Sequence, residues 1–218
     1  MRKSAFIPLA VILLMVVSAV YGTSRLLYAK NPDLNHSHAD FAIWVNGKKL
    51  DFSADKYMSS ETKQPSAGKK ELSRFLHLHD GIGYVIHRHK AGLTFGDFLD
   101  SLGLTVSGSC LRLDDYQYQR LDPAWRQDFA VTPNLCPTGK FHWQMYVNGV
   151  EQPANFAYLF KDGDHILFVY SAADSHVEEL KQMTNDACLY SQTCLWRGKA
   201  PTEHCIADPE VPCVVPQS

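Results

Sequence analysis

The dipeptide Asn-Gly stands twice next to short apolar runs, and no other local signal constrains the fold of this chain as strongly. Asn46-Gly47 follows the apolar run 41–45, and Asn148-Gly149 follows the run 141–147. A two-residue hairpin turn of this type needs positive φ at both central positions, which Asn and Gly adopt most readily. The sequence therefore predicts a β-hairpin over 39–52 and a tight turn after a later strand.

Further strand and helix signals follow along the chain. Residues 75–89 predict another hairpin, and 165–170 predict a final strand. Thr94 and Asp97 approximate a capping box at the start of a short apolar helix, and a second helix is expected from Ser175. These patterns predict an α+β fold of β-hairpins and a mixed sheet, with one helix packed across it.

Composition limits the class of protein. Charged residues make up 20 % of the chain and aromatic residues 11 %, which argues against disorder over most of its length. The formal net charge of -2 gives no basic surface, so we expect no nucleic-acid partner. The segment 59–70 is predicted to be an exposed loop, and 107–139 an irregular segment.

The amino terminus sets the expected compartment. Arg2 and Lys3 precede an uncharged stretch, 4–24, that is almost continuously apolar over 5–21. About 20 apolar residues span a bilayer, so we expect a single-pass transmembrane helix that anchors the chain in the cell membrane. A cleaved signal peptide, with Val17-Ser18-Ala19 as its cleavage site, stays open and would make the protein secreted. In both cases the domain lies outside the cytoplasm.

Cysteine usage agrees with export. All six cysteines follow the apolar segment, and an even number in an exported chain indicates disulfides. They are Cys110, Cys136, Cys188, Cys194, Cys205 and Cys213. We expect a Cys110–Cys136 bridge and two bridges among the last four, which form a disulfide-rich carboxy-terminal tail. The predicted organisation is an anchor or signal segment, a linker, a His-rich domain, and a helix with a Cys-rich tail, over 1–25, 26–35, 36–172 and 173–218.

Histidines provide the candidate site. Six of the ten form three His-x-His pairs, and on a strand the residues i and i+2 point to the same face about 7 Å apart. The pairs are His36/His38, His77/His79 and His87/His89. Imidazole is a common ligand of Zn and Cu, so the six histidines predict a site for a divalent transition metal. Asp40 and Asp80 are candidates for carboxylates that orient the imidazoles, or for additional ligands.

Whether two pairs share a face depends on the bend between them. A three-residue bend, Gly81-Ile82-Gly83, places His77 opposite His87 and brings both pairs to one side of the sheet. A two-residue bend would place them on opposite sides. We expect the longer bend, because it takes Gly at its last, left-handed position and Gly83 provides one.

Other interpretations of these histidines stay open. The cluster could be structural or could charge near pH 6 and act as a pH sensor, and it could serve catalysis without a metal. His142 and His165 are expected to flank strands, and His176 and His204 to lie on the surface, all without a role. Elsewhere the chain has no metalloprotease motif, no Ser/His/Asp spacing and no Gly-rich phosphate loop.

We therefore expect a membrane-anchored extracytoplasmic protein that binds Zn or Cu, and we assign no catalytic residue. A metalloenzyme remains an alternative, as does a module that binds a small ligand or a protein. A disulfide oxidoreductase is disfavoured, because the chain lacks Cys-x-x-Cys.

Parts of the sequence resemble known groups. The motifs at 36–40 (HSHAD), 77–81 (HLHDG) and 86–89 (IHRH) are similar to those of uncharacterised exported bacterial and archaeal proteins, some of which carry an automatic label of protein disulfide isomerase. The run 93–170, with Tyr146-Val147-Asn148-Gly149 among its marks, resembles the β-grasp module of transcobalamin-like binders. These resemblances imply a β-grasp-like fold and an exported location.

Overall fold

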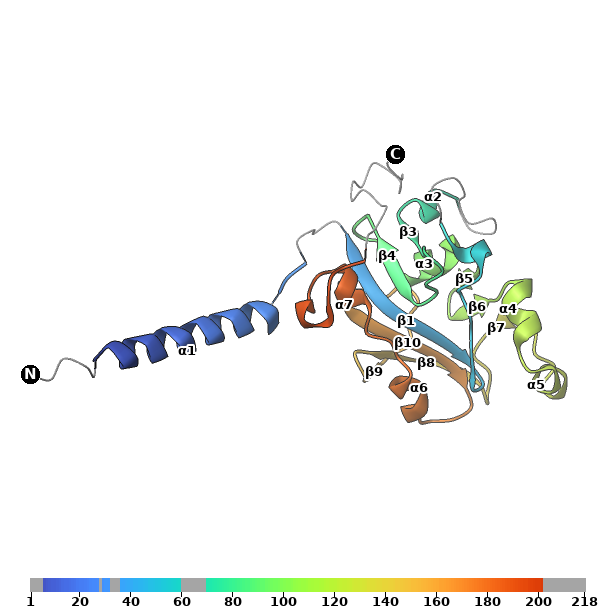
Figure 1. Ribbon diagram of the computed structural model, residues 1–218. Coiled ribbons are helices and arrows are strands. Elements are labelled where there is room, and N and C mark those ends of the chain that lie inside the picture. The colour runs from blue at the N-terminus through green and yellow to red at the C-terminus, as the bar shows by residue number, and fades with distance from the viewer. Residues whose placement is uncertain (1–5, 28, 32–35, 60–69, 202–218) are drawn as a thin grey trace, which may run out of the picture.

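A mixed β-sheet forms the centre of the computed structural model, which describes residues 6–27, 29–31, 36–59 and 70–201 (Figure 1). Within this part of the chain the sheet has seven strands in the order β3-β4-β1-β10-β8-β9, with β2 paired to β1. The strands are β1 (Ser37–Val45), β2 (Lys48–Lys49), β3 (Leu76–His77), β4 (Val85–Arg88), β8 (His142–Val147), β9 (Val150–Gln152) and β10 (Asp164–Ser171). β1 and β10 run parallel, and the other neighbours are antiparallel.

Strand β1 is buried at all nine positions. Phe41 and Ile43 point to the main core on one face, while Ala42 and Trp44 pack on the other. A strand that is covered on both faces needs apolar side chains at successive positions, which explains the apolar sequence of 41–45. Both Asn-Gly turns are confirmed, because all four of their residues have positive φ.

The first face of the sheet is covered by α3 (Phe95–Ser101). Its capping box is complete, since Thr94 accepts from the backbone of Asp97 and the Asp97 carboxylate accepts from the backbone of Thr94. The rings of Phe98 and Phe41 meet edge to face with centroids 4.9 Å apart. The predicted helix across the sheet is thus confirmed.

The prediction of an irregular segment over 107–139 is wrong. The chain forms a second, three-stranded sheet and two short helices there: β5 (Thr105–Ser107), β6 (Cys110–Arg112), α4 (Asp115–Arg120), α5 (Pro123–Asp128) and β7 (Asn134–Leu135). Asp114 and Asp122 cap the two helices with their side chains, a signal that the sequence carries. The expected Cys110–Cys136 disulfide closes this unit.

The second face of the sheet lies under the carboxy-terminal elements α6 (Val177–Lys181), α7 (Ala187–Tyr190) and η2 (Leu195–Arg197) (Figure 1). Leu180 and Met183 pack on the apolar residues of this face, among them Trp44. Cys188 and Cys194 form a disulfide. Cys205 and Cys213 lie outside the described residues, as does most of the predicted loop 59–70. The two short helices η1 (Asp55–Tyr57) and α2 (Lys70–Ser73) flank that loop.

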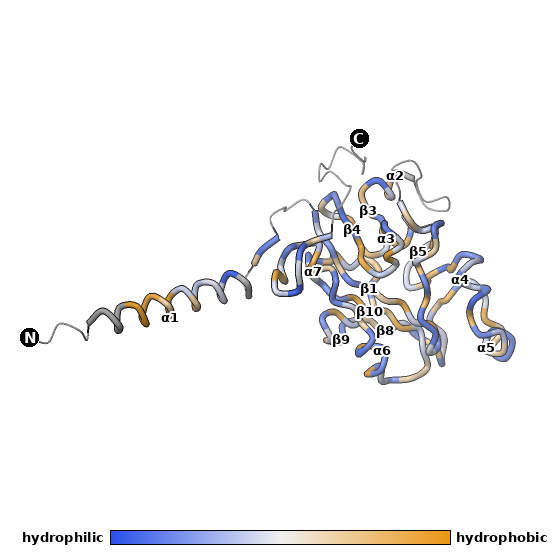
Figure 2. The backbone as a smooth tube through the Cα atoms, in the orientation of Figure 1, coloured by the Kyte–Doolittle hydropathy of each residue, from blue (hydrophilic) through white to orange (hydrophobic). Residues whose placement is uncertain are grey.

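The amino-terminal stretch forms α1 (Phe6–Leu27). Its hydropathy falls toward its carboxy-terminal end (Figure 2). Among the described residues, no helix combines the length and the apolar character needed to cross a membrane. The predicted transmembrane anchor is therefore not supported.

Candidate metal centre

All six paired histidines are buried together on the second face of the sheet, each with at most 7 % of its surface exposed. His38 of β1 lies opposite His87 of β4, and His87 lies opposite His77 of β3. These three side chains form a row across three neighbouring strands. His36, His79 and His89 follow at the strand ends, so the period of two brings each pair to the same face.

The rings are close enough to act on a common ion. One nitrogen from each of His36, His38 and His87 lies within 4.8 Å of the other two. In a tetrahedral shell with Zn–N bonds of about 2.0–2.1 Å the ligand nitrogens are about 3.3 Å apart, so small side-chain rotations would close this set. The ring centroids of His36 and His89 are 4.0 Å apart, which leaves a fourth imidazole beside the three.

The hairpin that brings the pairs together has the expected register but a different turn. His77 faces His87, as the three-residue bend predicts. The residues with positive φ are Asp80 and Gly81, whereas Gly83 is not among them. Gly83 is needed for space: a Cβ there would lie 2.4 Å from the backbone nitrogen of Ser53.

Hydrogen bonds fix the proton positions on four of the rings, beginning with His79 and His87. His79 Nδ1 lies 2.6 Å from the Asp80 carboxylate, which only accepts, so His79 carries its proton on Nδ1 and exposes a lone pair on Nε2. That Nε2 is 3.1 Å from His87 Nδ1, so His87 donates from Nδ1. The lone pair of His87 is therefore on Nε2. Asp80 is thus linked to His87 through His79, and its role in orienting a metal ligand stays a prediction.

His38 is oriented in the same way by the carboxy-terminal segment. Ser191 Oγ donates to the Asp162 carboxylate at 2.5 Å and lies 2.8 Å from His38 Nδ1. Since the hydroxyl proton is used by Asp162, Ser191 accepts from His38 Nδ1, and the His38 lone pair is on Nε2. His77 donates from Nδ1 to the backbone carbonyl of Ser73.

Burial keeps three of the clustered rings, those of His77, His87 and His89, neutral. Loss of solvation, with the adjacent His79 ring as the next cause, lowers the pKa of His77 to about 3. The same two causes lower the pKa of His87, and burial with the nearby His77 lowers that of His89. Neutral imidazole is the form that binds metals, so protons do not compete for these rings near neutral pH. For these three rings, a change of charge near pH 6 is disfavoured.

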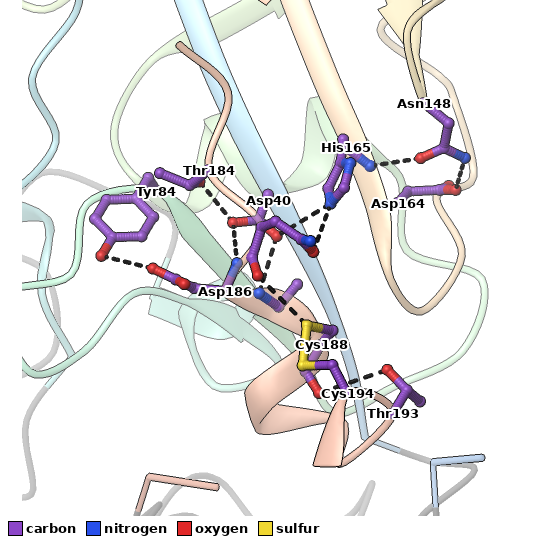
Figure 3. A network of polar contacts seen from close by, with 12 residues as sticks. Asp40, Tyr84, Asn148, Asp164, His165, Thr184, Asp186, Cys188, Thr193 and Cys194 are labelled. Carbon is purple, nitrogen blue, oxygen red and sulfur yellow. Dashed lines mark hydrogen bonds and ion pairs between the residues drawn. A yellow bond between two sulfur atoms is a disulfide. The ribbon is translucent and has the colours of Figure 1, made fainter. Parts of the chain in front are cut away.

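Asp40 lies away from the six clustered histidines, although its sequence position suggested that it orients them or binds the metal itself. Its carboxylate is fully buried and accepts from Thr184 Oγ1 and from the backbone nitrogens of Asp186 and Ala187 (Figure 3). Among the described residues, the one imidazole within ion-pair distance of Asp40 is that of His165, at 3.7 Å between Nε2 and Oδ2. Asp40 therefore attaches the carboxy-terminal segment to the sheet and contacts none of the six clustered histidines.

The other histidines lie apart from the cluster. His142 is exposed beside Gln144, and His165 contacts Asn185. His176 was expected at the surface, but it is 2 % exposed, because α6 folds back over Tyr146. His204 lies outside the described residues.

Comparisons with known proteins identify no family for this chain. A scan against protein-family models, a search of curated proteins and a search of solved structures find no match. The resemblances to an exported family and to a β-grasp module stay predictions.

Sequence reasoning missed three residues of the site, Asp162, Tyr190 and Ser191. Tyr190 stands edge-on to the His87 ring with centroids 4.8 Å apart, and Ser191 and Asp162 hold His38. They come from a loop and a four-residue helix, whose sequences carry no metal motif. Only the packing of α7 on the sheet identifies them.

Proposed function

We propose that this chain is a metal-binding protein that holds a divalent transition metal, Zn or Cu, on its buried histidine cluster. The observation that carries the proposal is the grouping of His36, His38 and His87, whose ligand nitrogens lie within 4.8 Å of one another in a buried position. Two of these rings, His38 and His87, carry their lone pair on Nε2 because other groups accept their Nδ1 protons.

The donor set supports this class of metal. Imidazole nitrogens suit Zn and Cu, whereas Mg and Ca prefer oxygen ligands. The three ligands, with His89 next to them, provide most of a four-coordinate shell. The Asp80–His79–His87 and Asp162–Ser191–His38 chains resemble the outer contacts that orient metal-bound imidazoles.

We also propose that the domain works outside the cytoplasm. The Cys110–Cys136 and Cys188–Cys194 disulfides support this location, because such bridges persist in oxidising compartments.

Elemental analysis of the untagged chain tests the metal-binding function. The purified protein should retain about one Zn or Cu ion per chain after dialysis, since buried imidazoles release ions slowly. The double variant His38→Asn/His87→Asn should lose the ion, because it removes two of the three grouped ligands. Circular dichroism establishes that the variant is folded.

The matched control is His142→Ala, which removes an exposed histidine outside the cluster and should leave the metal content unchanged. The proposal would be contradicted if the wild-type chain took up neither Zn nor Cu on incubation with each ion. It would also be contradicted if His38→Asn/His87→Asn still bound one ion per chain.

A further inference from the structure

The carboxy-terminal segment 184–194 lies directly on the histidine cluster. The Tyr190 ring is 4.8 Å from that of His87 and 5.4 Å from that of His38, measured between centroids. The next residue, Ser191, is fully buried and accepts from His38 Nδ1. An ion bound at the cluster would therefore lie behind these two side chains.

The segment is fastened to the sheet at its beginning. The Asp40 carboxylate accepts three hydrogen bonds from Thr184, Asp186 and Ala187, all at 2.6–2.9 Å (Figure 3). Tyr84 donates to the Asp186 carboxylate at 3.1 Å. These contacts fix where α7 starts, but they do not hold its far end.

The far end is attached through the Ser191–Asp162 hydrogen bond, and the Cys188–Cys194 disulfide closes the loop that contains the residues touching the cluster. Tyr190 and Ser191 lie between the two cysteines in the sequence. Cys194 is 2 % exposed, whereas Cys188 is only partly buried. The bridge therefore restrains both contacts, and Cys188 is its less buried end.

We infer that residues 184–194 form a lid over the metal centre, and that the Cys188–Cys194 bridge makes retention of the metal depend on the redox state. This inference rests on the proposed metal-binding function. With the bridge closed, Ser191 keeps the His38 proton on Nδ1 and Tyr190 covers the ion. With the bridge open, both restraints weaken and the ion exchanges faster.

The opening step needs a dithiol reductant. One of its thiolates attacks Cys188 Sγ, the Cys188–Cys194 bond breaks, and Cys194 leaves as a thiolate that takes up a proton. The second thiol of the reductant then displaces Cys188, which also becomes a thiol. Two electrons and two protons pass to the protein, and the dithiol becomes a disulfide.

Release of Zn²⁺ from the full-length chain tests the lid. The protein is loaded with Zn²⁺ alone and mixed with an excess of EDTA, and the rate of zinc loss is measured. The variant Cys188→Ser/Cys194→Ser imitates the open bridge without a reductant, which would itself bind zinc. It should release zinc about tenfold faster than the wild type, the lower end of the effect of outer contacts on metal sites.

The control is Cys110→Ser/Cys136→Ser, which removes the disulfide of the other unit. It should leave the release rate within about twofold of the wild type, because that bridge contacts none of the six clustered histidines. Ser191→Ala keeps both bridges and removes only the contact to His38, so it should also speed release. If Cys188→Ser/Cys194→Ser does not fold, the zinc release rate of Ser191→Ala tests the lid by itself.

Equal release rates in the wild type, Cys188→Ser/Cys194→Ser and Ser191→Ala would overturn the lid while leaving the metal site intact. Faster release in both double cysteine variants, with Ser191→Ala unchanged, would overturn it as well, since the effect would then be general loosening. A wild-type chain that binds no zinc contradicts the proposed function instead.

Discussion

Proton positions decide which nitrogen of each clustered histidine can bind a metal. Asp80 holds the proton of His79 on Nδ1, and His79 in turn receives the proton of His87. A negative charge two rings away thereby makes His87 Nε2 a better electron-pair donor. The chain of contacts runs through a partly exposed carboxylate, so it can be altered without disturbing the core.

Asp80→Asn should weaken zinc affinity about tenfold, because the amide still accepts from His79 but carries no charge. Competition with a chromophoric chelator measures the affinity. The control Asp174→Asn changes an exposed carboxylate outside the cluster and should have no effect. If Asp80→Asn bound zinc as tightly as the wild type, the relay through His79 would have no influence on the site.

The β3–β4 hairpin sets the register of two histidine pairs, and its turn depends on two different properties of glycine. Gly81 supplies a left-handed conformation next to Asp80. Gly83 instead lets the chain pass against the backbone of Phe52 and Ser53. The sequence showed that glycines were needed, but not that one of them serves close packing.

Gly83→Ala should destabilise the fold by about 1–3 kcal/mol, the usual cost of forcing extra atoms into a packed interior. The added Cβ would lie 2.5 Å from the carbonyl carbon of Phe52 and would push the hairpin away from it. Urea unfolding followed by tryptophan fluorescence gives the difference. At Gly139, where a Cβ would meet nothing within 4 Å, the same substitution should be nearly neutral, and equal effects at both positions would contradict this account.

The attachment of α7 to β1 depends on a single buried carboxylate. Asp40→Asn should raise hydrogen exchange in residues 184–187, because an amide cannot accept all three hydrogen bonds equally well, at a cost of about 1–3 kcal/mol. Zinc stoichiometry should not change, since Asp40 contacts none of the clustered histidines. Mass spectrometry gives both quantities. Loss of zinc with normal exchange would make Asp40 a ligand after all.

For the molecule as a whole, burial of neutral imidazoles links stability to pH. The folded-state pKa of His77 is about 3, below the ordinary value of 6.5, and those of His87 and His89 are lowered as well. The unfolded chain therefore binds more protons than the folded chain between these values. Stability from these groups is complete above pH 6.5 and declines as the pH falls from there toward the folded-state values.

The metal-free protein should thus lose stability on acidification from pH 7.5 to pH 5, with a slope that approaches about 1.4 kcal/mol per pH unit for each such histidine once the pH is below 6.5. Urea unfolding at several pH values gives the slope. In His77→Asn the slope should be smaller, because one of these titrating groups is gone. A flat profile down to pH 5 would mean that the folded cluster accepts protons as readily as the unfolded chain.

The sequence by itself determined the local features: both Asn-Gly turns, the Thr94–Asp97 capping box, the Cys110–Cys136 bridge and the shared face of each His-x-His pair. Turn chemistry and the period of two act over a few residues, so they can be read from the order of amino acids. The sequence also contains the capping residues of α4 and α5, Asp114 and Asp122, which the prediction of an irregular segment overlooked.

Only the tertiary structure decided which pairs meet and what covers them. His38 lies beside His87 because β1 pairs with β4, and Ser191 reaches His38 from 153 residues away. Asp40 has the same parity as His36 and His38, yet it binds α7, since the packing of the carboxy-terminal segment sets its partners. Such contacts depend on the balance of packing over the whole chain, which no local pattern records.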